Sequence, residues 1–181
     1  MPVIIKTPAE IEKMRELGRL AAEALDYIGD FVKPGVTTNE INQLVHDYHI
    51  NVQGGYPAPL HYGSPPFPKS CCTSVNHVIC HGIPDDKPLK NGDIINIDVT
   101  IKKDGFHGDS SRMYAVGQIS PVAKRLIDTT HAAMMAGIEA VRPGATLGDV
   151  GHACQQVAEN AGYSVVQEFC GHGIGRGFHE E

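Results

Sequence analysis

The chain has 181 residues, of which 41% are hydrophobic, and this is enough to bury the core of one domain. A net charge of −6 argues against a nucleic-acid-binding surface. Five cysteines without a C-x-x-C motif are typical of reduced thiols in a cytosolic protein. Because neither a signal-peptide pattern nor an apolar run of the ~20 residues of a membrane span is visible, we expect a cytoplasmic protein that does not bind membranes.

Two helices are predicted at the start of the chain. Thr7–Glu10 has the pattern of a capping box with proline at the first helical position, and apolar residues follow at helical spacing through Ile28. The turn Lys33–Gly35 separates this helix from a second one, which begins at Thr38 and ends before Gly54. A Pro-rich loop then leads to a predicted strand at 70–76 and a further apolar segment at 78–84.

Residues 91–111 predict a β-hairpin. Isoleucine and valine alternate with polar residues from 94 to 101, which places Asp98 on the polar face of a half-buried strand. If Lys102–Gly105 forms a four-residue turn, Asp98 lies directly opposite Asp109. Directly opposed like charges destabilise a sheet, so a divalent cation between them is the economical explanation. The alternative is a register error of one residue, with both aspartates solvated.

The second half of the chain repeats the first. Helices are predicted at about 121–140 and 147–161, followed by a strand at 164–169. The segment Val32–Thr37 recurs as Val141–Thr146, and Glu40 matches Asp149 at the same offset. We therefore expect one catalytic domain over 1–181, with repeat one at about 7–118 and repeat two at about 120–181. A complete second repeat would extend to about residue 226, so its last strands are expected to be missing.

Three histidines could join the aspartates. His172 lies in the glycine-rich stretch G-H-G-I-G-R-G, which contains neither G-x-G-x-x-G nor G-K-[ST] and opens no helix, so a nucleotide-binding loop is discounted. A neutral imidazole is the ligand that two aspartates lack if the site holds a transition metal. His81 is expected at the end of a strand, and His179 follows Phe178. Taken singly, each would be an ordinary surface or core histidine.

The chain resembles the type I methionine aminopeptidases over nearly its whole length. The matching segments are long: F-P-K-S-C-C-T-S-V-N-H-V-I-C-H-G-I-P at 67–84, N-G-D-I-I-N-I-D-V-T at 91–100, D-G-F-H-G-D-S-S at 104–111 and C-G-H-G-I-G-R-G-F-H-E-E at 170–181. The resemblance implies an α+β fold, the pseudo-symmetric "pita-bread" (creatinase/aminopeptidase) fold. In it, two helix-helix-strand repeats surround a central antiparallel sheet.

The resemblance also implies a site and a reaction. Asp98, Asp109 and His172 are expected to bind two divalent metal ions (cobalt, manganese, iron or zinc), with Asp109 bridging them. His81 and His179 resemble the catalytic histidines that contact substrate and the tetrahedral intermediate. The expected substrates are nascent polypeptide N-termini near the ribosome, whose initiator methionine is removed when the second residue is small. A monomer is expected. The remaining residues implied for the methionine pocket are Pro59, Tyr62, Phe67, Cys72 and Phe178.

Two departures from the family pattern keep alternatives open. The family uses two further glutamate ligands that would fall after residue 181, so the 1–181 chain alone is expected to be impaired. The Pro-rich segment 62–67 is longer than the usual bacterial loop, which affects the assignment of Pro59 and Tyr62. The alternatives are another hydrolase of the same fold, which cleaves before proline or acts on creatine, and a pseudo-enzyme that binds peptides or ribosomes without cleaving them.

Overall fold

The computed structural model describes residues 3–181, which group into two units. The first unit comprises the chain up to Ile119 together with His172–Glu181, and the second is Ser120–Gly171. Met1 and Pro2, where the predicted domain begins, lie outside the described residues. Each unit is described by itself below.

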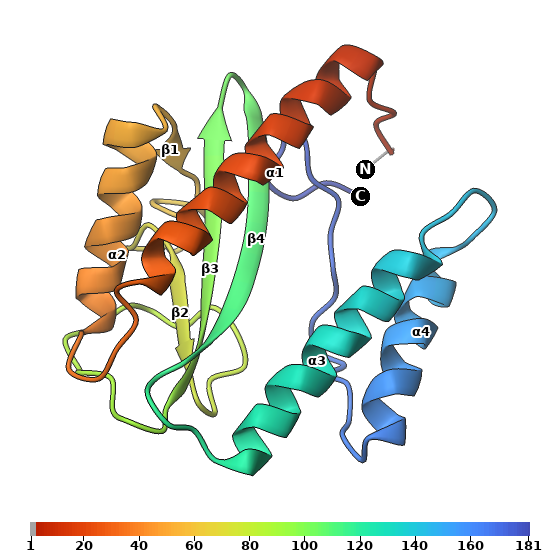
Figure 1. Cartoon of the computed structure of the whole chain (residues 1–181). Helices are drawn as coiled ribbons and strands as arrows, with labels where there is room; N and C mark the ends of the chain where they lie inside the picture. Colours follow the sequence, from red (N-terminus) through yellow and green to blue (C-terminus); the bar gives the residue numbers. More distant parts are fainter. Residues whose placement is uncertain (1–2) are drawn as a thin grey trace. The chain divides into compact units, whose positions relative to one another are not determined.

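Two helices lie on one side of the first unit. α1 spans Pro8–Gly29, and α2 spans Thr38–Asp47 and continues as one π-helical turn, Tyr48–Val52. The predicted capping box is confirmed, because the Thr7 hydroxyl accepts a hydrogen bond from the Glu10 amide while the Glu10 carboxylate accepts one from the Thr7 amide. α1 packs across β3 (Ile94–Lys103) and β4 (Phe106–Ala115) of the sheet (Figure 1). Its buried residues are Leu17, Leu20, Ala21, Ala24, Leu25 and Ile28.

The sheet of the first unit has four antiparallel strands, β1 (Tyr56–Pro57), β2 (Cys72–Val75), β3 (Ile94–Lys103) and β4 (Phe106–Ala115). β3 is central: β4 pairs with one edge of it, and β1 and β2 pair with the other. The predicted alternation is confirmed, since the apolar side chains of β3 are fully buried in the core beneath α1. These core residues are Ile95, Ile97, Val99 and Ile101.

The predicted register of the β3–β4 hairpin is wrong by two residues. Asp98 pairs with Ser111 and Asp109 pairs with Thr100, so the two aspartates are diagonal neighbours and are not directly opposed. The connection is a two-residue turn in which Asp104 (φ 49°) and Gly105 (φ 77°) both have positive φ. Asp-Gly is a favoured sequence for such a turn, whose twist matches that of the strands. A shift of two residues preserves the face, so both aspartates still project to the polar side.

Two apolar segments of the sequence, one of them predicted as a strand, do not form strands. Residues 78–84 are a loop that folds back on β2, where the Thr73 amide donates to the Gly82 carbonyl at 2.8 Å. Residues 164–169 also lack strand structure, and Val165 and Phe169 are exposed. β-branched residues alone do not make a strand, because its backbone groups need a pairing partner, and none pairs with this segment among residues 3–181.

The second unit is a pair of helices, α3 (Pro121–Ala140) and α4 (Leu147–Asn160), which pack against each other. The turn before α4 has the local structure of the turn before α2, as the repeat predicts. Gly35 and Gly144 have φ of 94° and 90°, and Thr37 and Thr146 each begin a capping box. None of the helices in the described range 3–181 has the length and apolar character needed to cross a bilayer.

Candidate metal centre and adjoining pocket

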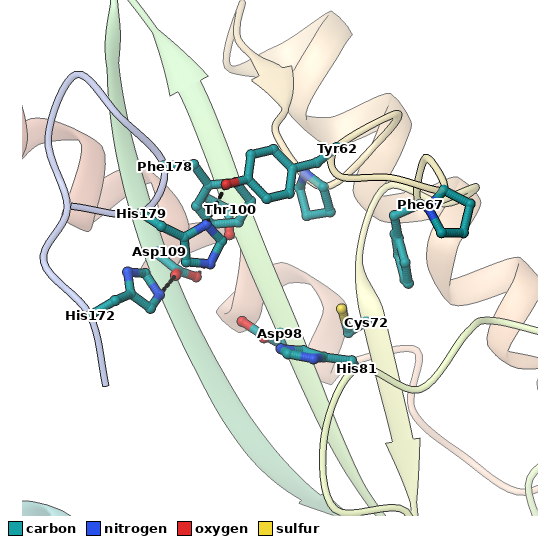
Figure 2. Close-up of a pocket in the computed structure, with 12 residues that line it drawn as sticks. Tyr62, Phe67, Cys72, His81, Asp98, Thr100, Asp109, His172, Phe178 and His179 are labelled. Carbon is teal, nitrogen blue, oxygen red and sulfur yellow. Dashed lines mark hydrogen bonds and ion pairs between the residues drawn. The ribbon is translucent and has the colours of Figure 1, made fainter. Parts of the chain in front are cut away.

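All ten residues predicted for the site line one cavity of about 280 Å³ in the first unit (Figure 2). The cavity lies on the polar face of the sheet, between β2, β3, β4, the Pro-rich loop and the C-terminal segment 172–181. The structure thus brings together residues that lie more than a hundred positions apart in the chain. The ten residues are Pro59, Tyr62, Phe67, Cys72, His81, Asp98, Asp109, His172, Phe178 and His179.

Two further lining residues were missed by sequence reasoning, Pro65 and Thr100. Thr100 is buried, and its hydroxyl donates a hydrogen bond to Asp109 Oδ1 at 2.8 Å. The sequence could have predicted this contact, because residues two apart on a strand point to the same face and Thr100 therefore lies on the face of Asp98. Pro65 lies within the Pro-rich loop, where no periodic pattern indicates which residues face inward.

The two aspartates form a region of unbalanced negative charge. Burial and the neighbouring Asp109 carboxyl raise the pKa of Asp98 from 3.8 to about 7, and the nearby His172 opposes this only in part. A carboxylate that is buried near a second carboxylate is costly to ionise unless a cation compensates it. The pair therefore provides oxygen ligands in a place where the protein itself supplies little positive charge.

His172 completes the donor set from the C-terminal segment. Its Nδ1 lies 2.9 Å from the carbonyl oxygen of Gly173. A carbonyl can only accept, so Nδ1 carries the proton and Nε2 keeps its lone pair when the ring is neutral. Nε2 lies 3.5 Å from Asp109 Oδ2. A lone pair that faces a carboxylate oxygen at this distance is the arrangement expected of two ligands of a common cation.

The donor set fits a divalent transition metal. Two carboxylates and one imidazole are the ligand types that manganese, iron, cobalt and zinc share. Among residues 3–181, no three His, Cys, Asp or Glu side chains already stand in an arrangement that encloses an ion. The fit therefore rests on the chemistry of the donors and on the unbalanced charge of Asp98 and Asp109, which a cation would neutralise.

His179 lies beside His172, with ring centroids 4.2 Å apart. Its Nδ1 is hydrogen-bonded to the Tyr62 hydroxyl at 2.7 Å, so Nε2 remains available on the other side of the ring. Burial and the neighbouring His172 lower the pKa of His179, which favours the neutral ring. The aromatic rings of Tyr62 and Phe178 pack against each other, with centroids 4.8 Å apart, and both contact His179.

His81 reaches the cavity from the loop after β2, not from the end of a strand as the sequence suggested. Its backbone has a φ of 54°, which is uncommon outside glycine. The following residue is held in place, because the Gly82 amide donates to Ser74 Oγ at 3.1 Å. Figure 2 shows the His81 ring beside the carboxyl group of Asp98, near the thiol of Cys72.

The remaining wall of the cavity is apolar. Proline and aromatic rings form it, together with the buried sulfur of Cys72. Burial and the carboxyl groups of Asp98 and Asp109 raise the pKa of the Cys72 thiol to about 12, so the thiol stays neutral. The cavity therefore joins a polar end, built from carboxylates and imidazoles, to an end that suits an apolar side chain.

Comparison with known proteins agrees with this site. The family profile described as metallopeptidase family M24 matches residues 12–181. The methionine aminopeptidase of Rickettsia prowazekii is 59% identical over the whole chain, which covers 69% of that protein. The Escherichia coli K12 methionine aminopeptidase is 53% identical over the whole chain, which covers 68% of that protein. The chain thus spans about two thirds of the length of these relatives.

Solved structures show the same fold. A crystal structure of the Rickettsia prowazekii methionine aminopeptidase superposes with a TM-score of 0.96 at 58% identity, over 99% of this chain and 71% of that one. The Pyrococcus furiosus prolidase superposes with a TM-score of 0.81 at 23% identity, over 98% of this chain and 50% of that one, and this likeness concerns the fold alone.

The fold and the donor set define a metal-dependent peptidase, and the chain belongs to metallopeptidase family M24. Peptidases of this family use divalent metal. Within the family the chain belongs to the methionine aminopeptidases, with the pita-bread fold that the sequence predicted.

Proposed function

We propose that this chain forms the site that removes the initiator methionine from polypeptides whose second residue is small. The observation that supports the proposal most strongly is the cavity itself, in which an apolar wall adjoins Asp98, Asp109 and His172. These three residues would hold two divalent ions, of cobalt, manganese, iron or zinc. The similarity to the two methionine aminopeptidases described above, at 59% and 53% identity, supports the same reaction.

Methionine suits the apolar wall for a physical reason. Its unbranched thioether fills irregular space and makes favourable contacts with aromatic rings. Phe67 and Phe178 provide such rings, and the neutral thiol of Cys72 adds a polarisable surface. A charged first residue would lose its hydration in this wall without gaining a partner. The pocket therefore discriminates against lysine or glutamate more strongly than against other apolar side chains.

The reaction needs an activated water and a stabilised oxyanion. Bound divalent cations lower the pKa of water and polarise a peptide carbonyl. His81 and His179 lie at the same cavity, where a donor aimed at the developing oxyanion stabilises charge that appears only in the transition state. The hydrogen bond between the Tyr62 hydroxyl and His179 Nδ1 fixes the His179 ring, so that its Nε2 is held in one orientation.

The cellular setting is proposed from composition. Substrates would be nascent chains near the ribosome in the cytoplasm, and the protein would act as a monomer that binds neither nucleic acid nor membrane. All five cysteines are free, as expected in a reducing compartment.

Hydrolysis of short peptides tests the proposal. With added Co²⁺ or Mn²⁺, Met-Ala-Ser should be cleaved at least about a hundredfold faster than Lys-Ala-Ser, because the lysine charge must be buried in the apolar wall. Chelation should abolish the activity, and readdition of metal should restore it. His81→Ala should lower kcat more than it raises KM. Equal cleavage of the two peptides would contradict the proposed pocket.

A further inference from the structure

The segment 172–181 carries two histidines of the site but belongs to no helix or named strand. An isolated antiparallel bridge holds it together: the Gly173 amide donates to the Glu180 carbonyl at 2.8 Å, and the Glu180 amide donates to the Gly173 carbonyl at 2.7 Å. Gly173 directly follows His172, and Glu180 directly follows His179. The position of Glu180 therefore sets the spacing of the two imidazole rings.

The Glu180 side chain is held by the segment that precedes α1. Lys6 Nζ lies 2.5 Å from Glu180 Oε2, and the two side chains are only 15% and 12% exposed. The other carboxylate oxygen accepts a hydrogen bond from the Gly177 amide at 2.9 Å. Lys6 and this amide hold the pKa of Glu180 below its ordinary value, so the carboxylate is charged and paired. Figure 1 shows the segment before α1 and the C-terminal end of the chain close together.

The glycines of the segment allow this ion pair to pack against the backbone. A Cβ atom at Gly175 would lie 2.5 Å from Lys6 Cε and 2.8 Å from Glu180 Oε1, which is closer than side chains tolerate. The Gly175 carbonyl in turn accepts hydrogen bonds from the backbone amide and the Nδ1 of His107 on β4, at 2.9 and 3.1 Å. The ion pair therefore presses the segment onto the sheet that carries Asp109.

A second contact joins the same two parts of the chain. Arg176 binds Glu10 Oε1 through two nitrogens at 3.1 and 3.3 Å, and its guanidinium lies 4.5 Å from the ring centroid of Phe106. The Arg176 side chain is 62% exposed, so this contact is screened by solvent. Lys6 and Glu180 form the more protected of the two contacts.

We propose that Lys6 is a positioning residue for the metal and substrate site and acts through Glu180. The inference rests on the proposed function of His172 and His179. Without the Lys6 charge, the shielded Glu180 carboxylate is left with backbone amide donors alone and turns toward water. The Gly173–Glu180 bridge then loosens, and the two imidazoles lose their fixed spacing. Lys6 lies 174 positions from Glu180 in the sequence, on a segment that contributes nothing to the cavity lining.

Lys6→Met tests this role, since it removes the charge and retains the unbranched chain. We expect kcat for Met-Ala-Ser to fall on the order of tenfold, because small displacements of catalytic groups are costly, with KM changed less than about twofold. Lys6→Arg should recover most of the rate. The control Arg15→Met removes an exposed cation of α1 that pairs with Glu12 in the same helix, and it should leave both constants unchanged.

A readout without metal separates this inference from the proposed function. In metal-free protein, the ring carbon-bound proton signals of His172 and His179 should shift in Lys6→Met and stay in place in Arg15→Met. Glu180→Gln should give the same shifts, and the double variant should be no worse than either single one, because the two residues act as a unit. Unchanged ring signals in Lys6→Met would overturn the positioning role. Equal rates of Met-Ala-Ser and Lys-Ala-Ser cleavage by the wild-type protein would instead overturn the proposed function.

Discussion

Two regions of the first unit supply the proposed metal ligands, and they are held in different ways. The β3–β4 hairpin carries Asp98 and Asp109 on paired backbone, above a fully buried apolar face. The segment 172–181 carries His172 on a chain whose regular backbone pairing is limited to one bridge. The carboxylates are therefore fixed by the sheet, whereas the imidazole depends on one bridge, isolated backbone hydrogen bonds and side-chain contacts.

This difference determines how each half of the site can fail. A change in the backbone or register of the hairpin must disturb the core, because the polar and apolar faces alternate along the same strand. A change in the segment can displace His172 and His179 while the core remains folded. The following variants separate these two kinds of failure, and they are ordered from the largest expected effect to the smallest.

Asp98→Asn should have the largest effect on activity. The amide retains the shape of the side chain but loses the charge that binds a cation. Mutation of residues that only hydrogen-bond to a metal ligand typically lowers metal affinity or activity about 10–100-fold. For Asp98→Asn we therefore expect activity to fall on the order of 10²-fold or more. Isothermal titration with Mn²⁺ and peptide hydrolysis measure the two effects. Asp104→Asn is the matched control, because Asn tolerates the positive φ of that turn position. Equal metal binding by both variants would exclude Asp98 as a ligand.

Two glycine-to-alanine variants contrast the regions directly. A Cβ at Gly108 would press on the backbone and side chain of Leu17 in α1, so we expect a global destabilisation of about 1–3 kcal/mol. A Cβ at Gly175 would meet only the movable ends of Lys6 and Glu180. Gly175→Ala should therefore lower kcat severalfold with little change in the urea midpoint. Gly171→Ala, where nothing lies within 4 Å, serves as the control. Equal losses of stability in the Gly108 and Gly175 variants would contradict the view that the hairpin and the segment 172–181 are held in different ways.

The stability of the metal-free protein should depend on Asp98 as pH changes. Because the folded-state pKa is raised from 3.8 to about 7, the folded protein holds a proton that the unfolded chain releases. The contribution of Asp98 to stability is thus present at low pH and is lost as pH rises from about 4 through 7. We expect the urea midpoint of wild type, minus that of Asp98→Asn at the same pH, to decrease as the pH is raised from 5 to 8. A difference that stays constant over this range would argue against the raised pKa.

Tyr62→Phe should have the smallest effect of the series. It removes the hydroxyl that contacts His179 Nδ1 but retains the ring that packs on Phe178. Loss of the free energy of one ordinary hydrogen bond should lower kcat roughly threefold to tenfold. Tyr56→Phe is the matched control, since its hydroxyl donates to the Leu60 carbonyl at 3.3 Å, away from His179. If both variants turned over at the wild-type rate, the Tyr62 hydroxyl would have no part in orienting His179.

Sequence reasoning succeeded where the structure is governed by local periodicity. Helix starts, the buried face of β3 and the shared face of the two aspartates follow from alternation and capping. The predicted register of the β3–β4 hairpin was wrong because the turn length depends on whether Asp104 adopts a positive φ. The alternation of apolar and polar residues does not indicate this. The strand expected at 164–169 did not form, because strand formation depends on a partner and not on composition alone.

Long motif matches predict the site, but they do not predict the contacts that support it. The family resemblance places His81, His172 and His179 at one site, and all three line the same cavity. The contacts Lys6–Glu180 and Tyr62–His179 join residues more than a hundred positions apart. No spacing rule predicts such contacts, because they depend on how the C-terminal segment folds against the start of α1.

The central claim is that a divalent metal binds between the sheet carboxylates and the imidazole of the C-terminal segment. Anomalous diffraction from crystals of the protein soaked in Zn²⁺ tests it most directly. We predict a peak in contact with Asp98, Asp109 and His172 Nε2, at ligand distances of roughly 2.0–2.2 Å. A zinc ion bound elsewhere, or one that leaves either aspartate uncoordinated, would contradict the account.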